Sequence, residues 1–63
     1  MLSLEYYSVN FGALPQLPDR WFVAYHPRLE MYMAHGPNEW ESMVTCDRFQ
    51  ARRWCIDAAR GED

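Results

Sequence analysis

The stretch TCDRFQARRWCIDAARG, residues 45–61, contains the one clear helix signal of this 63-residue sequence. Asp47 can cap the helix, because its carboxylate accepts hydrogen bonds from the free N–H groups of the first turn. Gln50 follows three residues later, where its side chain can reach back to the cap. Gly61 is typical of the position just after a helix end. The pattern predicts a helix over residues 48–60.

A spacing of about 100° per residue divides this helix into two apolar stripes. The first stripe consists of Ala51, Trp54, Cys55 and Ala58, and its small side chains allow a close approach to a sheet. The second stripe consists of Phe49 and Ile56, with Arg52 and Arg53 beside it. Two interpretations of the second stripe stay open. Either it is core, with the Arg52 stem lying along it, or it faces a partner.

The residues before the helix predict strands and turns. Residues 1–11 alternate with a change of phase near Tyr6, and the two prolines of residues 12–18 indicate a loop. Strands are predicted at residues 20–26, 29–35 and 40–45, which are rich in aromatic and β-branched side chains. The expected fold is a single α+β domain over residues 1–63. It has an antiparallel sheet of three to four strands and one C-terminal helix packed on one face.

Turns centred on residues 27–28 and 37–38 would set the registers, placing Tyr25 opposite Glu30, Tyr32 opposite Met43, and His35 opposite Trp40. The face expected beneath the helix then collects Phe22, Ala24, Leu29, Met31, Met33, Trp40 and Val44. The opposite face collects Trp21, Val23, Tyr25, Tyr32 and Met43, with Glu30 and Glu41. One helix covers only one face, so either residues 1–19 cross the second face or an aromatic patch is exposed.

Composition argues against several classes of protein. The net charge of −3 disfavours unaided binding to phosphate backbones. The first residues have neither the basic region of a signal peptide nor a long apolar run, which predicts a cytoplasmic protein without a membrane span. Cys46 and Cys55 are expected to stay unpaired, because eight residues of helix rise span about 12 Å and a disulfide needs Cα atoms within about 7 Å.

No pattern of residues predicts an enzyme, a metal site or a cofactor. His26, His35, Cys46 and Cys55 are four possible zinc ligands, but none of their spacings matches a Cys-x-x-Cys or His-x-x-x-His pair. The three glycines are isolated, so no phosphate-binding loop is expected.

Two resemblances bear on function. Residues 20–60 resemble the three-strand-plus-helix arm-binding domain of phage-type integrases, through Arg20-Trp-Phe-Val-Ala-Tyr, Met31-Tyr-Met and Phe49-Gln-Ala-Arg-Arg-Trp. That resemblance implies DNA contact by the sheet face opposite the helix, where this chain carries Trp, Tyr and two Glu. In its acidity and its richness in aromatics and Arg, the chain also resembles the small phage-encoded inhibitors of host systems, anti-CRISPR proteins among them.

The main hypothesis is a non-enzymatic protein that binds and blocks another protein. Arg, Tyr, Trp and Met are enriched in protein interfaces, and the chain has 6, 4, 3 and 4 of them. The expected partner-binding residues are Trp21, Tyr25, Tyr32, Met43, Arg52 and Arg53. The alternatives are a nucleic-acid-binding module that uses Arg48, Arg52, Arg53 and Arg60, and a structural homodimer.

Overall fold

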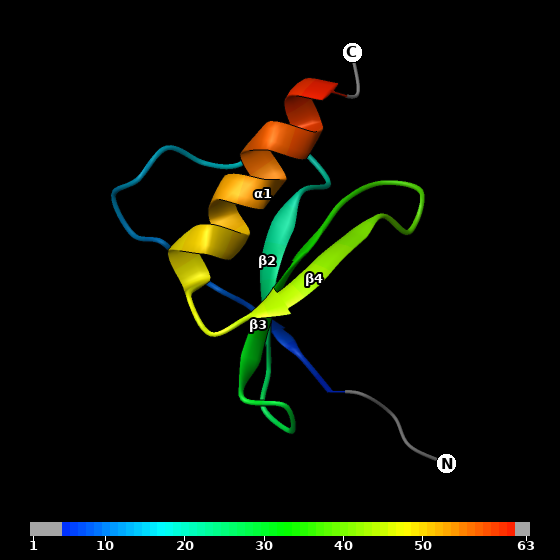
Figure 1. Cartoon of the computed structure of the whole chain (residues 1–63). Helices are drawn as coiled ribbons and strands as arrows, with labels where there is room; N and C mark the ends of the chain where they lie inside the picture. Colours follow the sequence, from blue (N-terminus) through cyan, green and yellow to red (C-terminus); the bar gives the residue numbers. More distant parts are fainter. Residues whose placement is uncertain (1–4, 62–63) are drawn as a thin grey trace.

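The computed structural model describes residues 5–61 as a four-stranded antiparallel sheet with one helix packed on it (Figure 1). The elements are β1 (Tyr7–Ser8), β2 (Phe22–His26), β3 (Met31–His35), β4 (Glu41–Thr45) and α1 (Arg48–Gly61). The strands lie in the order β1-β2-β3-β4. This confirms the predicted α+β class. The predicted first strand is shorter than expected, and its residues 1–4 lie outside the described residues.

The start of α1 follows the predicted cap. The Asp47 carboxylate accepts hydrogen bonds from the N–H groups of Phe49 and Gln50, at 2.9 and 3.4 Å. The Thr45 hydroxyl in turn accepts from the Asp47 N–H at 3.1 Å, so side chains satisfy donors that a helix start leaves free. The helix ends at Gly61, one residue beyond the predicted end.

The register of the first hairpin differs from the prediction by two residues. Tyr25 lies opposite Tyr32 and not opposite Glu30. The cause is a four-residue turn in which the N–H of Glu30 donates to the carbonyl of His26 at 2.8 Å. Glu30 takes the left-handed conformation there, with φ of 54°. A shift of two residues still leaves the same side chains together on one face, because faces alternate with period two.

The second hairpin was also predicted in the wrong register. Tyr32 lies opposite Thr45 in place of Met43, and His35 lies opposite Glu41 in place of Trp40. An irregularity between Met33 and His35 separates these pairs. There the Ser42 hydroxyl accepts the Ala34 N–H at 2.9 Å, which is the kind of local bulge that sequence periodicity does not reveal.

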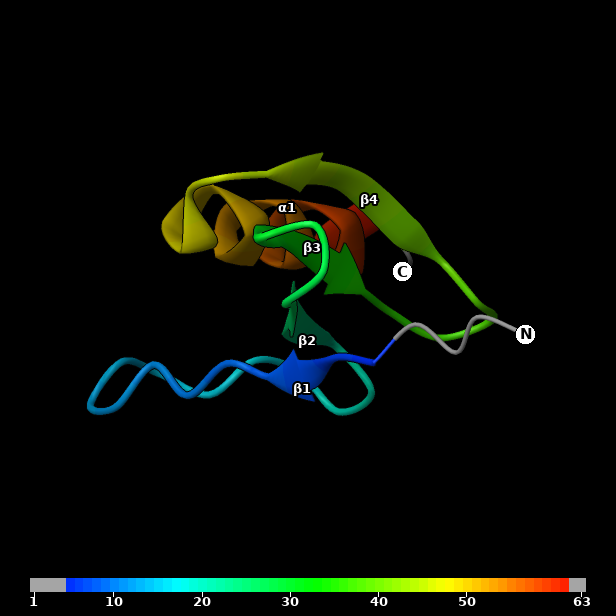
Figure 2. The same cartoon turned by 90° about the horizontal axis from the view of Figure 1, so that it is seen from below.

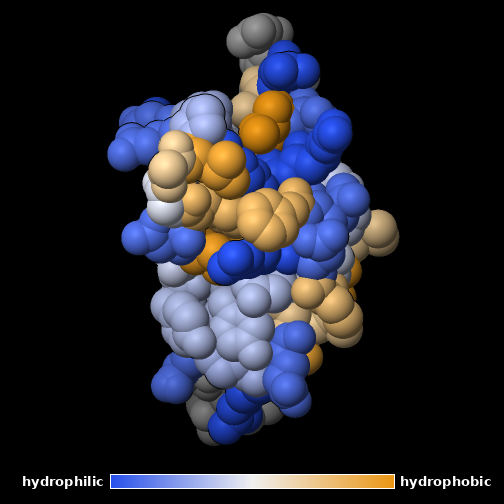
Figure 3. Space-filling view, turned by 90° about the vertical axis from the view of Figure 1, so that its left-hand side faces the viewer, coloured by the Kyte–Doolittle hydropathy of each residue, from blue (hydrophilic) through white to orange (hydrophobic). Residues whose placement is uncertain are grey.

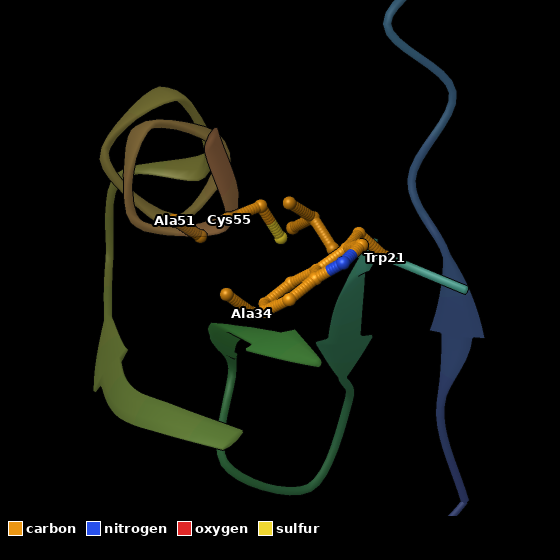
Figure 4. Close-up of a cluster of buried hydrophobic side chains, with 5 residues drawn as sticks. Trp21, Ala34, Ala51 and Cys55 are labelled. Atoms are coloured by element: carbon orange, nitrogen blue, oxygen red, sulfur yellow. The ribbon is translucent and has the colours of Figure 1, made fainter. Parts of the chain in front are cut away.

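The helix covers the face that was predicted to lie away from it, so the face assignment is wrong for β2 and β3, whereas Trp40 packs on the core as predicted. Ala51 and Cys55 of α1 are fully buried against Val23 and Ala34, with Trp21 closing the cluster (Figure 4). The helix lies against β2, β3 and β4, and β1 lies at the far edge of the sheet (Figure 2). The side chains at this contact are small, which allows the layers to approach closely. The predicted first stripe of the helix, however, is the one that packs on the core.

A close contact between Trp21 and Gly36 completes the core. The Trp21 ring packs against the Trp40 ring at 5.2 Å between centroids. It also lies over Gly36, where an added Cβ would come within 2.5 Å of the indole carbon Cζ3. Glycine is therefore required at this turn by the approach of the indole.

The opposite face carries an aromatic and histidine cluster, made of Tyr6, Phe22, His26 and His35. The Tyr6 ring lies 5.3 Å from the His26 ring and 5.5 Å from the His35 ring. Residues 9–17, in contrast, pack on the helix side, where Val9, Phe11 and Leu17 touch the core. The segment before β2 thus contributes to both sides of the sheet.

Candidate interaction surface

The six residues predicted to bind a partner do not form one surface. Trp21 is only 8% exposed and lies in the core beneath α1, so its predicted place on an open face is wrong. Tyr25 and Tyr32 are half-buried neighbours on β2 and β3, whereas Met43 is 74% exposed on β4. On the helix, Arg52 is half-buried and Arg53 is exposed.

A row of three tyrosines crosses β1, β2 and β3. Tyr7 lies opposite Tyr25, and Tyr25 lies opposite Tyr32. The ring centroids are 5.6 Å and 4.9 Å apart, with tilted planes, within the range favoured by aromatic pairs. The first residue of α1, Arg48, lines the same hollow of about 280 Å³. The row therefore lies on the helix side of the sheet, beside the helix N-terminus.

The central tyrosine keeps its proton at physiological pH. Partial burial raises the pKa of Tyr25 above its ordinary value, and Glu30, Tyr7 and Tyr32 raise this pKa further. A neutral phenol both donates and accepts hydrogen bonds. The row thus offers aromatic rings together with hydroxyl groups, which suits a contact that is part apolar and part polar.

Beside the tyrosines, side-chain contacts hold the loop before β2 against the helix. The guanidinium of Arg52 donates to the carbonyl of Pro15 at 2.7 Å and lies 5.2 Å from the centre of the Phe11 ring. Phe11 in turn packs on Phe49, at 5.8 Å between centroids. The second stripe of the helix therefore packs on the loop through Phe49, and Arg52 holds the loop in place.

These two regions form one continuous surface. Val9 and Asn10 line both the tyrosine hollow and a second hollow under the loop, which Arg52 borders. Arg48 also reaches over the Phe49 ring, at 4.9 Å. Figure 3 views this side, where hydrophobic side chains lie among hydrophilic ones. We name it the tyrosine–arginine face, which consists of Tyr7, Phe11, Leu14, Tyr25, Tyr32, Arg48, Phe49 and Arg52.

Sequence reasoning placed Tyr25, Tyr32 and Arg52 among the binding residues but missed Tyr7 and Phe11. The pairing of Tyr7 with Tyr25 depends on β1, which is only two residues long. The alternating pattern of residues 1–11 was a signal for this strand, but not for its register. Phe11 joins the face through a loop contact with the helix, which no periodic pattern predicts.

In the cluster of the opposite face, His26 is buried and His35 is half-buried, and their rings make few hydrogen bonds. Among the described residues, neither ring nitrogen of His26 has a hydrogen-bond partner, and neither has Nε2 of His35. Burial lowers the pKa of His35; nearby Glu41 opposes this shift, and His26 adds to it. Within residues 5–61, no group of three or more His, Cys, Asp or Glu side chains is arranged to hold a metal ion.

The two cysteines lie in different surroundings. Cys55 is buried, and its thiol donates to the carbonyl of Phe22 at 3.3 Å. Burial raises the pKa of this thiol, while a hydrogen bond to the His35 backbone and the Arg52 charge act in the opposite direction. Cys46 is exposed, with its sulfur 3.8 Å from that of Met31. A thiol with a raised pKa is a poor nucleophile, so Cys55 is a packing residue.

No protein family, curated protein or solved structure matches this chain. Among the described residues, no helix has both the length and the apolar character needed to cross a membrane.

Proposed function

We propose that this chain is a non-enzymatic interaction protein that binds another protein through the tyrosine–arginine face. A partner surface covered in this way is closed to its other ligands, so binding would block it. The resemblance to phage-encoded inhibitors of host systems, including the anti-CRISPR type, implies the same mode of action.

The observation that carries the proposal is the exposure of large side chains on one continuous face. Tyr7 is 59% exposed and Phe49 is 51% exposed, although folding places each in contact with other aromatic rings. Large exposed apolar patches on a protein surface usually mark interaction sites. Tyr and Arg are also the residue types that dominate binding energy at protein interfaces.

The charges on the face favour a protein partner over a nucleic acid. Arg52 is occupied by the Pro15 carbonyl, which leaves Arg48 as the cation beside the tyrosine row. Glu30 lies close enough to Tyr25 to raise its pKa and would repel a phosphate backbone. A protein surface with apolar side chains and a carboxylate opposite Arg48 fits this arrangement better.

Adjacent residues on opposite faces of the sheet supply a matched test. A photo-crosslinking amino acid, benzoylphenylalanine, replaces either Tyr7 or Tyr6, which are both exposed. Tyr7 lies on the tyrosine–arginine face, and Tyr6 stacks on Phe22 and His35 of the other face. After irradiation in cells that produce the chain, we expect a cross-linked protein from position 7 and none from position 6.

The captured partner is then purified and titrated with variants. Tyr7→Ala should weaken binding at least about tenfold, as expected for an aromatic anchor. Arg48→Glu should do the same and mainly slow association, whereas the exposed Arg53→Glu should change affinity less than about threefold. Circular dichroism checks that each variant is folded. Cross-links from position 6 alone, cross-links to nucleic acid, or equal effects of the two charge reversals would contradict the proposal.

A further inference from the structure

The cluster of aromatic and histidine rings on the face opposite the helix contains buried nitrogen atoms that lack partners. His26 is only 6% exposed, and among the described residues neither of its ring nitrogens has a hydrogen-bond partner. Nε2 of His35 is likewise buried and without a partner there. Buried polar atoms in folded proteins almost always have a partner. Three such nitrogens in one cluster therefore point to a ligand that the imidazoles themselves would bind.

The two imidazole rings lie at a distance that suits one shared metal ion. Their centroids are 5.7 Å apart, and the ring planes are tilted by 38°. Because a metal such as zinc bonds an imidazole nitrogen at about 2.0–2.1 Å, two rings on one ion have centroids roughly 5–6.5 Å apart. Nδ1 of His35 lies 3.9 Å from Oε2 of Glu41, and metal-bound histidines commonly direct their second nitrogen to a carboxylate. Nε2 of His35 is then the nitrogen available to the ion.

A methionine of β3 adds a sulfur donor at the same place. Met33 pairs with Ala24, in the row between those of His26 and His35, so its side chain belongs to the same face of the sheet. Met33 is half-buried, and the small Ala24 is fully buried beneath the rings. The Tyr6 ring lies 5.3 Å from the His26 ring and 5.5 Å from the His35 ring. The three donors are thus gathered beside an aromatic cover.

The chemistry of these donors selects the ion. Imidazole suits several transition metals, whereas a thioether is a soft ligand that selects Cu(I). All three donors are uncharged, which suits a monovalent ion in a buried place. Structural zinc sites, in contrast, take four ligands. Because the third donor is a thioether, this set differs from the groups of three His, Cys, Asp or Glu side chains, of which residues 5–61 contain none.

We propose that His26, His35 and Met33 bind one Cu(I) ion beside the Tyr6 ring. Glu41 is a positioning residue, which orients the His35 ring through Nδ1. The site lies on the face opposite the tyrosine–arginine face, so it does not depend on the proposed function.

Anaerobic titration with Cu(I), in competition with the chromophoric chelator bicinchoninate, tests the proposal. Cys46 is exposed, and its thiol would bind Cu(I) by itself, so every variant is made in the Cys46→Ser protein. We expect this protein to bind one Cu(I) per chain, at least about tenfold more tightly than it binds Zn(II). His26→Phe and His35→Phe should each weaken Cu(I) binding at least about tenfold.

Two methionines provide a matched comparison. Met33→Leu should weaken Cu(I) binding about tenfold, whereas Met43→Leu, a change on β4 at a side chain that is 74% exposed, should leave it unchanged. Circular dichroism checks that each variant is folded. X-ray absorption of the Cu(I)-loaded Cys46→Ser protein needs no further variant. It should show nitrogen neighbours at about 2.0 Å and one sulfur at about 2.3 Å from the ion.

The proposal would be overturned if the Cys46→Ser protein binds no Cu(I), since water alone would then satisfy the buried nitrogens. An absorption spectrum without a sulfur neighbour would also overturn it. Equal affinities of Met33→Leu and Met43→Leu, or Zn(II) binding as tight as that of Cu(I), would do the same.

Discussion

The contact between Gly36 and Trp21 gives a sharp prediction about stability. A Cβ added at Gly36 would lie 2.5, 2.7 and 2.8 Å from the Trp21 carbons Cζ3, Cε3 and Cη2, whereas ordinary contacts between carbons are about 3.5–4.0 Å. The indole has little room to retreat, because it packs on Trp40 and on a core that includes the fully buried Ala34 and Cys55. Gly36→Ala should therefore force the core apart.

The expected cost follows from two opposing effects. Overpacking of a well-packed core destabilises a protein by about 1–3 kcal/mol. Replacing glycine by alanine stabilises it by about 0.4–1 kcal/mol, because alanine restricts the unfolded chain. The net loss is about 1–2 kcal/mol from the free energy of unfolding. In a domain of this size each kcal/mol corresponds to about 4–8 °C, so the melting temperature should fall by roughly 5–15 °C.

The assay is urea unfolding followed by far-ultraviolet circular dichroism, with an osmolyte present if the parent midpoint is too low. Gly61→Ala is the matched control, since a Cβ there meets no atom within 4 Å. Trp21→Phe removes the half of the indole that carries the three clashing carbons. In that background, Gly36→Ala should cost less than about 0.5 kcal/mol, a coupling that reports direct contact. A Gly36→Ala protein as stable as the parent would refute the described packing.

Three further predictions concern the core, the thiols and the histidines. Trp21→Ala should lower the free energy of unfolding by about 3–5 kcal/mol, enough to unfold most of the protein. Trp54→Ala should lower it less, because Trp54 is only half-buried. Equal melting temperatures for the two variants would contradict this ranking. Under native conditions iodoacetamide should label Cys46 quickly and the buried Cys55 only after unfolding. Mass spectrometry counts the labels, and rapid labelling of both thiols would contradict the burial of Cys55. Because burial lowers the pKa of His35, the folded state binds this proton less readily than the unfolded state. The stability contribution that depends on neutral His35 should be fully present above about pH 6.5 and should be lost as the pH drops below that value. Urea titrations at about pH 7.5 and about pH 5 measure this loss, which should be smaller in His35→Phe.

The local features of this fold could be predicted from the sequence because local chemistry determines them. Asp47 caps the helix through bonds to residues two and three positions away, and such bonds depend on neighbours alone. The stripe that includes Ala51 and Cys55 follows from the helical period, and both residues are buried. The three main strands follow from runs of aromatic and β-branched residues, with ends within two residues of those observed.

The registers depended on details that periodicity does not contain. The first hairpin is set by a turn that places Glu30 in the left-handed region, and the second by the Ser42 hydroxyl in place of a backbone partner. The tyrosine row exists only because these registers align Tyr25 with Tyr32 and β1 adds Tyr7. Two of the three tyrosines were predicted to be binding residues, but their alignment in one row was not.

The choice of the covered face was decided by the tertiary structure. Both faces of the sheet carry large apolar side chains, so hydrophobicity alone did not distinguish them. The helix packs where Val23 and Ala34 allow its own small residues to come close, with Trp21 at the margin. The other face bears Phe22 and His35, whose rings stack with Tyr6. Alternation along a strand fixes which residues share a face, but how closely two layers can approach depends on side-chain size and shape across the contact, and that is a property of the assembled fold.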